Sequence, residues 1–277
     1  MRAISSPAMA ESNGRPDPNG KGASRAQRAL FISDFPRAIG GFGWYAVTSR
    51  MLNARAPRGD GHPVLVLPGL LAGDASTIVM RRFLRRLGYE VHGWGLGRNI
   101  GPTPQAVHGM GAKFEALVER HHQKVSVIGW SLGGIYARVL ARLKAEDVRQ
   151  VITLGSPYRL DEPTRTRAYR AYMRFSDRHV ADVVVPTSAA AADPLPLPTT
   201  SVYSKFDGIV PWDACMEPPG PQSESIEVFG SHFGYGHNPA VLWLIADRLA
   251  QPEGEWKKFT PPTFARRLFG RFRVEAT

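Results

Sequence analysis

Ser131 stands in a setting that suits nucleophilic chemistry. It is the centre of the segment Gly129-Trp130-Ser131-Leu132-Gly133, which directly follows the apolar run 125–128. A G-x-S-x-G sequence behind such a run is typical of a strand that turns sharply into a helix and leaves the serine hydroxyl exposed. A serine hydroxyl becomes reactive only beside a base and close to hydrogen-bond donors that stabilise an oxyanion. The motif also arises by chance, so the prediction depends on partners elsewhere in the chain.

An acid and a base follow later strand-like segments of the chain. Asp207 comes soon after the run 200–203, and His232 comes soon after the run 226–229. Catalytic groups of parallel sheets gather at the carboxyl ends of the strands, so both side chains are expected at the edge that carries Ser131. His232 would accept the proton of Ser131 and later donate it to the leaving group. Asp207 would hold the imidazole in the required tautomer and stabilise the imidazolium.

Each of these two residues has a plainer interpretation and a nearby competitor. Asp207 begins an Asp-Gly dipeptide, which is a common turn sequence, so its carboxylate could serve only the turn. His232 could be an ordinary loop histidine. Asp213 and His237 are the alternative acid and base, although Asp213 lies further from the strand and His237 directly precedes a predicted helix start.

The oxyanion of such a reaction needs two backbone N–H groups. One is expected from Leu132, the residue after the nucleophile. The other is expected from the loop after the first core strand, residues 68–73, where Leu70 is the candidate. A leucine in this loop could equally pack against the core, and the two roles are compatible because only its backbone would contact the oxyanion.

Apolar runs alternate with amphipathic segments from residue 62 onward. The expected strands are 64–67, 89–94, 125–128, 148–154, 200–203 and 226–229, and the expected helices are 76–87, 103–122, 132–144 and 240–250. This alternation predicts the α/β class, with a mostly parallel central sheet and helices on both faces.

The chain divides into five parts by composition. Residues 1–27 are polar and rich in glycine and proline, which predicts a disordered tail. Residues 28–61 are predicted to be helical segments packed on the core, broken near Pro36 and Gly40-Gly41, with a membrane-facing patch as the alternative. The core is expected at 62–157 and 199–250, a helical cap insertion at 158–198 and a basic tail at 251–277.

The net charge of +11, from 35 Lys and Arg against 24 Asp and Glu, is spread along the chain. No nucleic-acid-binding module accompanies it, so we expect solvated surface charge, or contact with an anionic membrane, rather than nucleic-acid binding. As a hypothesis, the aromatic and basic segment 264–272 could rest on such a surface. Neither a signal peptide nor a membrane span is evident, and the one cysteine favours a reducing compartment, so the predicted location is cytoplasmic. No metal or organic cofactor is implied.

The chain resembles the α/β-hydrolase superfamily, and within it the lipase-like esterases, especially the small bacterial triacylglycerol lipases. The matching segments are 64–70, 129–134, 151–157, 201–210 and 230–234. The resemblance implies an α/β-hydrolase fold with Ser131, Asp207 and His232 as catalytic triad and with Leu70 and Leu132 as oxyanion donors. Two features depart from the family pattern. Pro68 replaces the usual histidine after the first strand, and the cap is longer than in minimal lipases.

These observations predict a serine hydrolase that cleaves small-molecule or lipid carboxylic esters through an acyl-enzyme. An acyltransferase would use the same triad with an alcohol in place of water, and a non-catalytic binding protein of the same fold is the third alternative. Aromatic and methionine side chains of the cap could line an acyl pocket or simply pack on the core; these are Tyr158, Tyr169, Tyr172, Met173 and Phe175. The oligomeric state is not predicted.

Overall fold

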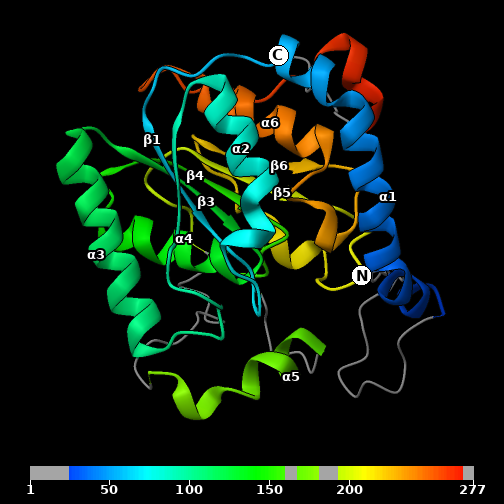
Figure 1. The fold of residues 1–277 in the computed structure, drawn as a ribbon, viewed down its shortest axis with the longest axis horizontal. Coiled ribbons are helices and arrows are strands. Elements are labelled where there is room, and N and C mark those ends of the chain that lie inside the picture. The colour runs from blue at the N-terminus through cyan, green and yellow to red at the C-terminus, as the bar shows by residue number, and fades with distance from the viewer. Residues whose placement is uncertain (1–24, 160–166, 181–192, 271–277) are drawn as a thin grey trace, which may run out of the picture.

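The computed structural model describes residues 25–159, 167–180 and 193–270 (Figure 1). Most of the predicted disordered tail, two parts of the predicted cap and the last residues of the basic tail lie outside these ranges.

A six-stranded sheet forms the centre of the molecule, and every pairing in it is parallel. Its spatial order is β2-β1-β3-β4-β5-β6. The strands are β1 (Pro63–Leu67), β2 (Glu90–Gly93), β3 (Val125–Trp130), β4 (Val148–Leu154), β5 (Thr199–Tyr203) and β6 (Ser223–Glu227). Strands β1, β3 and β4 are almost wholly buried, which explains the mostly apolar sequences of β1 and β3.

Helices cover both faces of the sheet, as predicted. Helices α1 (Arg25–Arg55), α2 (Ile78–Leu87) and α6 (Pro239–Leu249) contribute to the core on one face, and α3 (Pro104–His121) and α4 (Leu132–Leu143) pack on the other. The helix starts follow ordinary capping chemistry. The Thr103 hydroxyl accepts a hydrogen bond from the Ala106 N–H at 3.2 Å, and the Asn238 amide oxygen accepts one from the Ala240 N–H at 2.9 Å.

Helix α1 differs from the prediction of broken segments. It begins at Arg25, inside the predicted tail, and runs without interruption through Pro36 and Gly40-Gly41. These residues weaken an isolated helix because proline lacks an N–H and glycine gains entropy on unfolding. Contacts of α1 with α6, with α2 and with residues 232–234 hold the helix together across them.

Strand β6 also differs from its predicted position. The apolar residues 226–229 suggest a strand there, whereas the strand is Ser223–Glu227. β6 lies at the edge of the sheet, and Ile226 is its only fully buried residue, so no apolar run marks where it begins. His232 therefore follows the strand by five residues and lies in a short 3-10 helix, His232–Gly234.

The described part of the cap lies beyond the carboxyl ends of the strands. It contains α5 (Arg167–Met173) and a 3-10 turn, Ser176–Arg178 (Figure 1). The His179 ring nitrogen Nε2 lies 2.9 Å from the Ile100 carbonyl, and the Val180 N–H donates to the Pro102 carbonyl at 2.9 Å. These bonds attach the end of the cap to the segment that follows β2.

The described part of the basic tail packs on the core. Its 3-10 helix spans Thr263–Leu268. Elsewhere in the described residues, 3-10 helices also span Asp74–Thr77 and Asp213–Cys215. Ala265 and Phe269 are buried, and Phe269 forms an antiparallel bridge with Val228. Phe264 stays exposed beside Trp243.

Candidate active site

Ser131 occupies the sharp turn between β3 and α4. Its backbone has φ 53° and ψ −119°, an uncommon conformation for a residue with a side chain. The Ser131 N–H donates to the Leu154 carbonyl at 2.8 Å, which fixes the turn against β4. Glycine is required on both sides, because a Cβ on Gly129 would overlap the Gly133 carbonyl and one on Gly133 would overlap the Leu67 carbonyl.

Asp207 and His232 form a buried pair in the loops that follow β5 and β6. The His232 ring nitrogen Nδ1 lies 2.7 Å from Asp207 Oδ2, and only 6% and 2% of the two side chains are exposed. Burial lowers the pKa of His232, but the negative charge of Asp207 and its hydrogen bond raise it more. The net pKa of His232 therefore lies above its ordinary 6.5.

The strand pairing brings Ser131 and this pair to one edge of the sheet. β3, β4, β5 and β6 are consecutive parallel neighbours, so their carboxyl ends lie side by side. Gly155, which directly follows β4, approaches both groups of the pair: a Cβ there would lie 3.2 Å from His232 Nδ1 and 3.1 Å from Asp207 Oδ2. Neither Ser131 Oγ nor His232 Nε2 has a hydrogen-bond partner among the described residues, so the two atoms are not bonded to each other in this structure.

The loop after β1 closes the other side of Ser131. A Cβ on Gly69 would lie 3.3 Å from the Ser131 Cβ, so the loop backbone passes directly beside the nucleophile. Within the described chain no acceptor takes the Leu70 N–H. The Leu132 N–H is the first of α4, and such N–H groups have no acceptor within their own helix. These two N–H groups are the predicted oxyanion donors.

Solved structures of lipases and esterases share this arrangement of strands and helices. Aspergillus fumigatus lipase B matches with a TM-score of 0.53 at 14% identity, over 72% of this chain but only 56% of the lipase chain. EstE1, a carboxylesterase from a metagenomic library, matches with a TM-score of 0.53 at 16% identity, over 73% and 83% of the two chains. A structure from the metagenome-derived lipolytic enzymes LipS and LipT gives 0.52 at 18% identity, over 70% and 93%. The protein has the α/β-hydrolase fold. No protein-family model and no curated protein matches the sequence.

The buried Asn99 holds the loop that follows β1. Its side-chain amide donates to the Pro68 carbonyl at 2.8 Å, and its backbone carbonyl accepts the Leu71 N–H at 2.6 Å. Leu71 itself has a positive φ of 62°. Pro68 therefore contributes its carbonyl to the support of the loop. No local sequence pattern around Asn99 signals this role.

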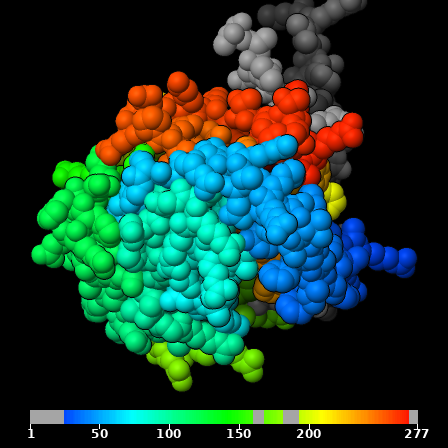
Figure 2. Space-filling model, turned by 45° about the horizontal axis from the view of Figure 1, so that its top comes forward, coloured from blue at the N-terminus to red at the C-terminus, as the bar shows by residue number. Residues whose placement is uncertain are grey.

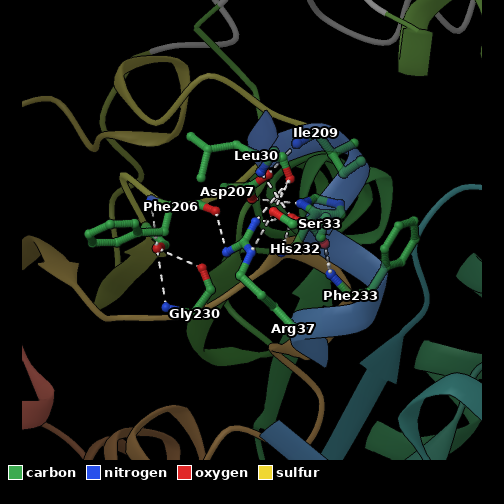
Figure 3. A network of polar contacts seen from close by, with 12 residues as sticks. Leu30, Ser33, Arg37, Phe206, Asp207, Ile209, Gly230, His232 and Phe233 are labelled. Atoms are coloured by element: carbon green, nitrogen blue, oxygen red, sulfur yellow. Dashed lines mark hydrogen bonds and ion pairs between the residues drawn. The ribbon is translucent and has the colours of Figure 1, made fainter. Parts of the chain in front are cut away.

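Asp34 of α1 is the site residue that the sequence analysis missed. It is fully buried, and its carboxylate accepts backbone N–H bonds from Gly208 at 2.9 Å, His232 at 3.0 Å and Phe233 at 3.0 Å. Figure 3 shows the network of polar contacts in which Arg37 of α1 lies beside the loops that carry Asp207 and His232. A signal was present, because Asp34 is the one acidic residue between 25 and 59, in an otherwise apolar and basic stretch.

Arg37 completes this junction from the next turn of α1. Its guanidinium donates to the Phe206 carbonyl at 2.8 Å and to the Leu30 carbonyl at 3.0 Å, and it lies 3.4 Å from Asp34 Oδ2. An N-terminal helix outside the predicted core thus fixes both loops of the candidate pair.

Replacing Asp34 with asparagine is expected to act through His232 rather than through substrate contact. The amide cannot accept all three backbone bonds, so the unfolding free energy should fall by about 1–3 kcal/mol. If the candidate site is active, kcat should fall more than KM changes. The negative charge of Asp34 raises the pKa of His232, so in Asp34→Asn the acidic limb of the pH–rate profile should move to lower pH.

Ser49→Ala on the same helix is the control. It loses only a hydrogen bond to the Ala46 carbonyl and should leave that profile unchanged. An unshifted profile in Asp34→Asn would limit this residue to a stabilising role.

The alternative acid and base have other surroundings. Asp213 is exposed, and its carboxylate accepts the neighbouring Ala214 N–H at 3.0 Å. His237 Nε2 lies 2.7 Å from the Ala38 carbonyl, and its ring packs edge-on against Phe42, so it anchors α1. Asp207 also serves the turn that was its plainer interpretation, since its Oδ1 accepts the Ile209 N–H at 2.8 Å. Its other oxygen is the one that contacts His232.

A second serine–histidine–aspartate set lies where β1 and β3 begin. His62 Nε2 is 2.8 Å from Ser126 Oγ, and its Nδ1 is 2.5 Å from Asp60 Oδ1. Ser126 and His62 are both buried within the fold, and Ser126 lies inside strand β3, so no substrate reaches its hydroxyl. This set therefore connects β1 to β3. It also shows that close contact between a serine, a histidine and an aspartate does not by itself identify a catalytic site.

Two further features limit what this part of the molecule can bind. The described residues contain no cluster of three or more His, Cys, Asp or Glu that could hold a metal ion. Tyr158, one of the cap residues considered for an acyl pocket, is 1% exposed, and its hydroxyl lies 2.8 Å from both the Cys215 carbonyl and the Glu217 carboxylate. Tyr158 is therefore a core residue.

Proposed function

We propose that the protein is a serine hydrolase that cleaves carboxylic esters at Ser131. The observation that carries the proposal is the buried contact of 2.7 Å between His232 and Asp207, at the sheet edge where Ser131 has its strained turn conformation. The likeness to structures named as a lipase, a carboxylesterase and lipolytic enzymes supports the choice of substrate class by analogy.

The proposed reaction has two halves. Ser131 Oγ attacks the ester carbonyl while His232 Nε2 takes the hydroxyl proton, and the Asp207 carboxylate stabilises the imidazolium. The N–H groups of Leu70 and Leu132 donate to the oxyanion of the tetrahedral intermediate. His232 then protonates the departing alcohol, which leaves an acyl group on Ser131. Water, deprotonated by His232, attacks that acyl group; the bond to Ser131 Oγ breaks, His232 returns the proton to Oγ, and the acid is released.

Exposed aromatic side chains near the pair favour an ester with an apolar acyl group. Phe206 and Phe233 each directly neighbour one member of the pair in sequence and are 45% exposed. Burial of apolar acyl carbons against such side chains would lower the free energy of substrate binding.

A series of p-nitrophenyl esters tests this function, with acyl chains that lengthen in steps of two carbons from about 2 to about 12 carbons. We expect hydrolysis of several esters, with kcat/KM rising with chain length over the shorter members. Adding an alcohol such as glycerol separates the two enzyme classes. An acyltransferase would form the new ester faster than the free acid, whereas a hydrolase would keep releasing acid.

No hydrolysis and no transfer across the series by the folded protein would contradict the proposal and favour the non-catalytic alternative.

A cytoplasmic location stays a prediction from the single cysteine, which is buried in the structure.

A further inference from the structure

The outward surface of α1 is apolar. Every exposed residue of this helix from Ala29 to Val47 is apolar, glycine or proline. The large exposed side chains are Ile32, Phe35, Ile39, Phe42, Trp44, Val47 and, one turn further, Met51. Soluble proteins rarely expose an apolar patch of this extent without a binding role. We call these seven side chains the α1 face.

The polar residues of α1 are turned away from this face or bonded within the helix. Asp34, its only acidic residue, is buried against the His232 segment. The hydroxyls of Thr48 and Ser49 donate to the carbonyls of Trp44 and Ala46 at 2.8 and 3.0 Å. Along this stretch the helix therefore presents mainly carbon to the outside, the reverse of an ordinary surface helix.

Positive charge borders the α1 face at both ends. Arg25 and Arg28 are exposed before it, Arg50 and Arg55 are exposed at and after its end, and no acidic side chain of α1 is exposed. A helix with an apolar surface and arginines beside it matches the interface of a bilayer that contains anionic lipid. A second copy fits less well, because pairing two such faces would bring arginines against arginines in either helix direction.

We propose that the α1 face docks on an anionic lipid surface with the helix lying parallel to the bilayer plane. The stretch from Ala29 to Val47 is about 27 Å long, so it offers a long line of contact. Among the described residues no helix is both long and apolar enough to cross a bilayer, which is consistent with contact at the interface.

The neighbouring surface extends the α1 face at both ends. Figure 2 shows α1 on the outside of the molecule with the C-terminal segment beside it. An apolar groove between α1, α6 and that segment is lined by Trp44, Met51, Trp243 and Phe264. At the other end the Phe35 ring packs edge-on against Phe233, at 6.1 Å between centroids. Docking would therefore bring Phe233, the residue after His232, close to the lipid. Only the idea that this places the catalytic site beside the lipid rests on the proposed function.

Flotation with vesicles tests the docking without any assay of activity. Vesicles of phosphatidylcholine with phosphatidylglycerol should bind the full chain, and vesicles of phosphatidylcholine alone should bind it at least about tenfold more weakly. High salt should weaken binding to the anionic vesicles. The double variant Ile39→Asp/Val47→Asp, at positions 60% and 82% exposed, should lose about tenfold or more of the partition coefficient.

Leu143→Asp is the matched control, because Leu143 is 74% exposed on α4, at the opposite face of the sheet. It should bind vesicles as the unmodified protein does, and thermal melts should show that all variants fold. Two results would overturn the proposal. One is vesicle binding by the double variant equal to that of the unmodified protein, or no binding by either. The other is a dimer, seen by light scattering, that the double variant dissociates, since a second copy would then cover the α1 face.

Discussion

Replacing Ser131 with alanine is expected to abolish ester hydrolysis while leaving the fold intact. The change removes only the hydroxyl, which makes no hydrogen bond among the described residues, so the melting temperature should stay within a few degrees. Loss of the nucleophile should lower kcat by about 10⁴- to 10⁶-fold, with residual rate from the oxyanion donors. The measurement is the steady-state hydrolysis of the best p-nitrophenyl ester.

Ser126→Ala is the control for this experiment, because Ser126 belongs to the second serine–histidine–aspartate set. It should lose some stability with its bond to His62 but retain hydrolysis. Activity lost in Ser126→Ala and retained in Ser131→Ala would contradict the account. It would assign the reaction to Ser126, His62 and Asp60 instead of Ser131.

Replacing Asp207 with asparagine is expected to have the second largest effect. The amide keeps the shape of the side chain but removes the charge that orients and stabilises the His232 imidazolium. We expect kcat to fall by about 10³- to 10⁴-fold. The pH profile should change as well. In the unmodified protein hydrolysis should decline as the pH falls through the raised pKa of His232, because the protonated ring is no base. Without the Asp207 charge, the lowering of that pKa by burial is opposed only by the weaker effect of Asp34, so the acidic limb should move to lower pH.

Asp213→Asn tests the alternative acid directly. Asp213 is exposed, and among the described residues its carboxylate accepts a hydrogen bond from the adjacent Ala214 N–H rather than from a histidine, so this variant should keep the full rate and the unmodified pH profile. Full activity in Asp207→Asn together with loss in Asp213→Asn would show that the acid is wrongly assigned.

The elements of the core were predictable because local sequence and tertiary position agree in them. The buried strands read as apolar runs, and Thr103 and Asn238 mark helix starts by capping chemistry that depends on nearby residues only. The G-x-S-x-G turn was predictable for the same reason, since close backbone approaches around Gly129 and Gly133 permit no side chain.

The features of the fold and of the candidate site that the sequence did not predict depend on contacts between residues far apart in the chain. α1 survives Pro36 because other elements pack on it, and β6 lacks an apolar run because it is an edge strand. Asp34 acts on residues about 200 positions away, and Asn99 supports a loop about 30 positions earlier. The same separation explains why the sequence does not predict the set of Asp60, His62 and Ser126, since their arrangement exists only once β1 and β3 pair.

Labelling with a fluorophosphonate probe, followed by intact-mass and peptide mass spectrometry, tests the activated serine most directly. The account predicts one probe per molecule, located on Ser131, with labelling lost in Ser131→Ala, greatly slowed in Asp207→Asn and retained in Ser126→Ala. A folded protein that takes up no probe, or that carries the probe on another residue, would contradict it.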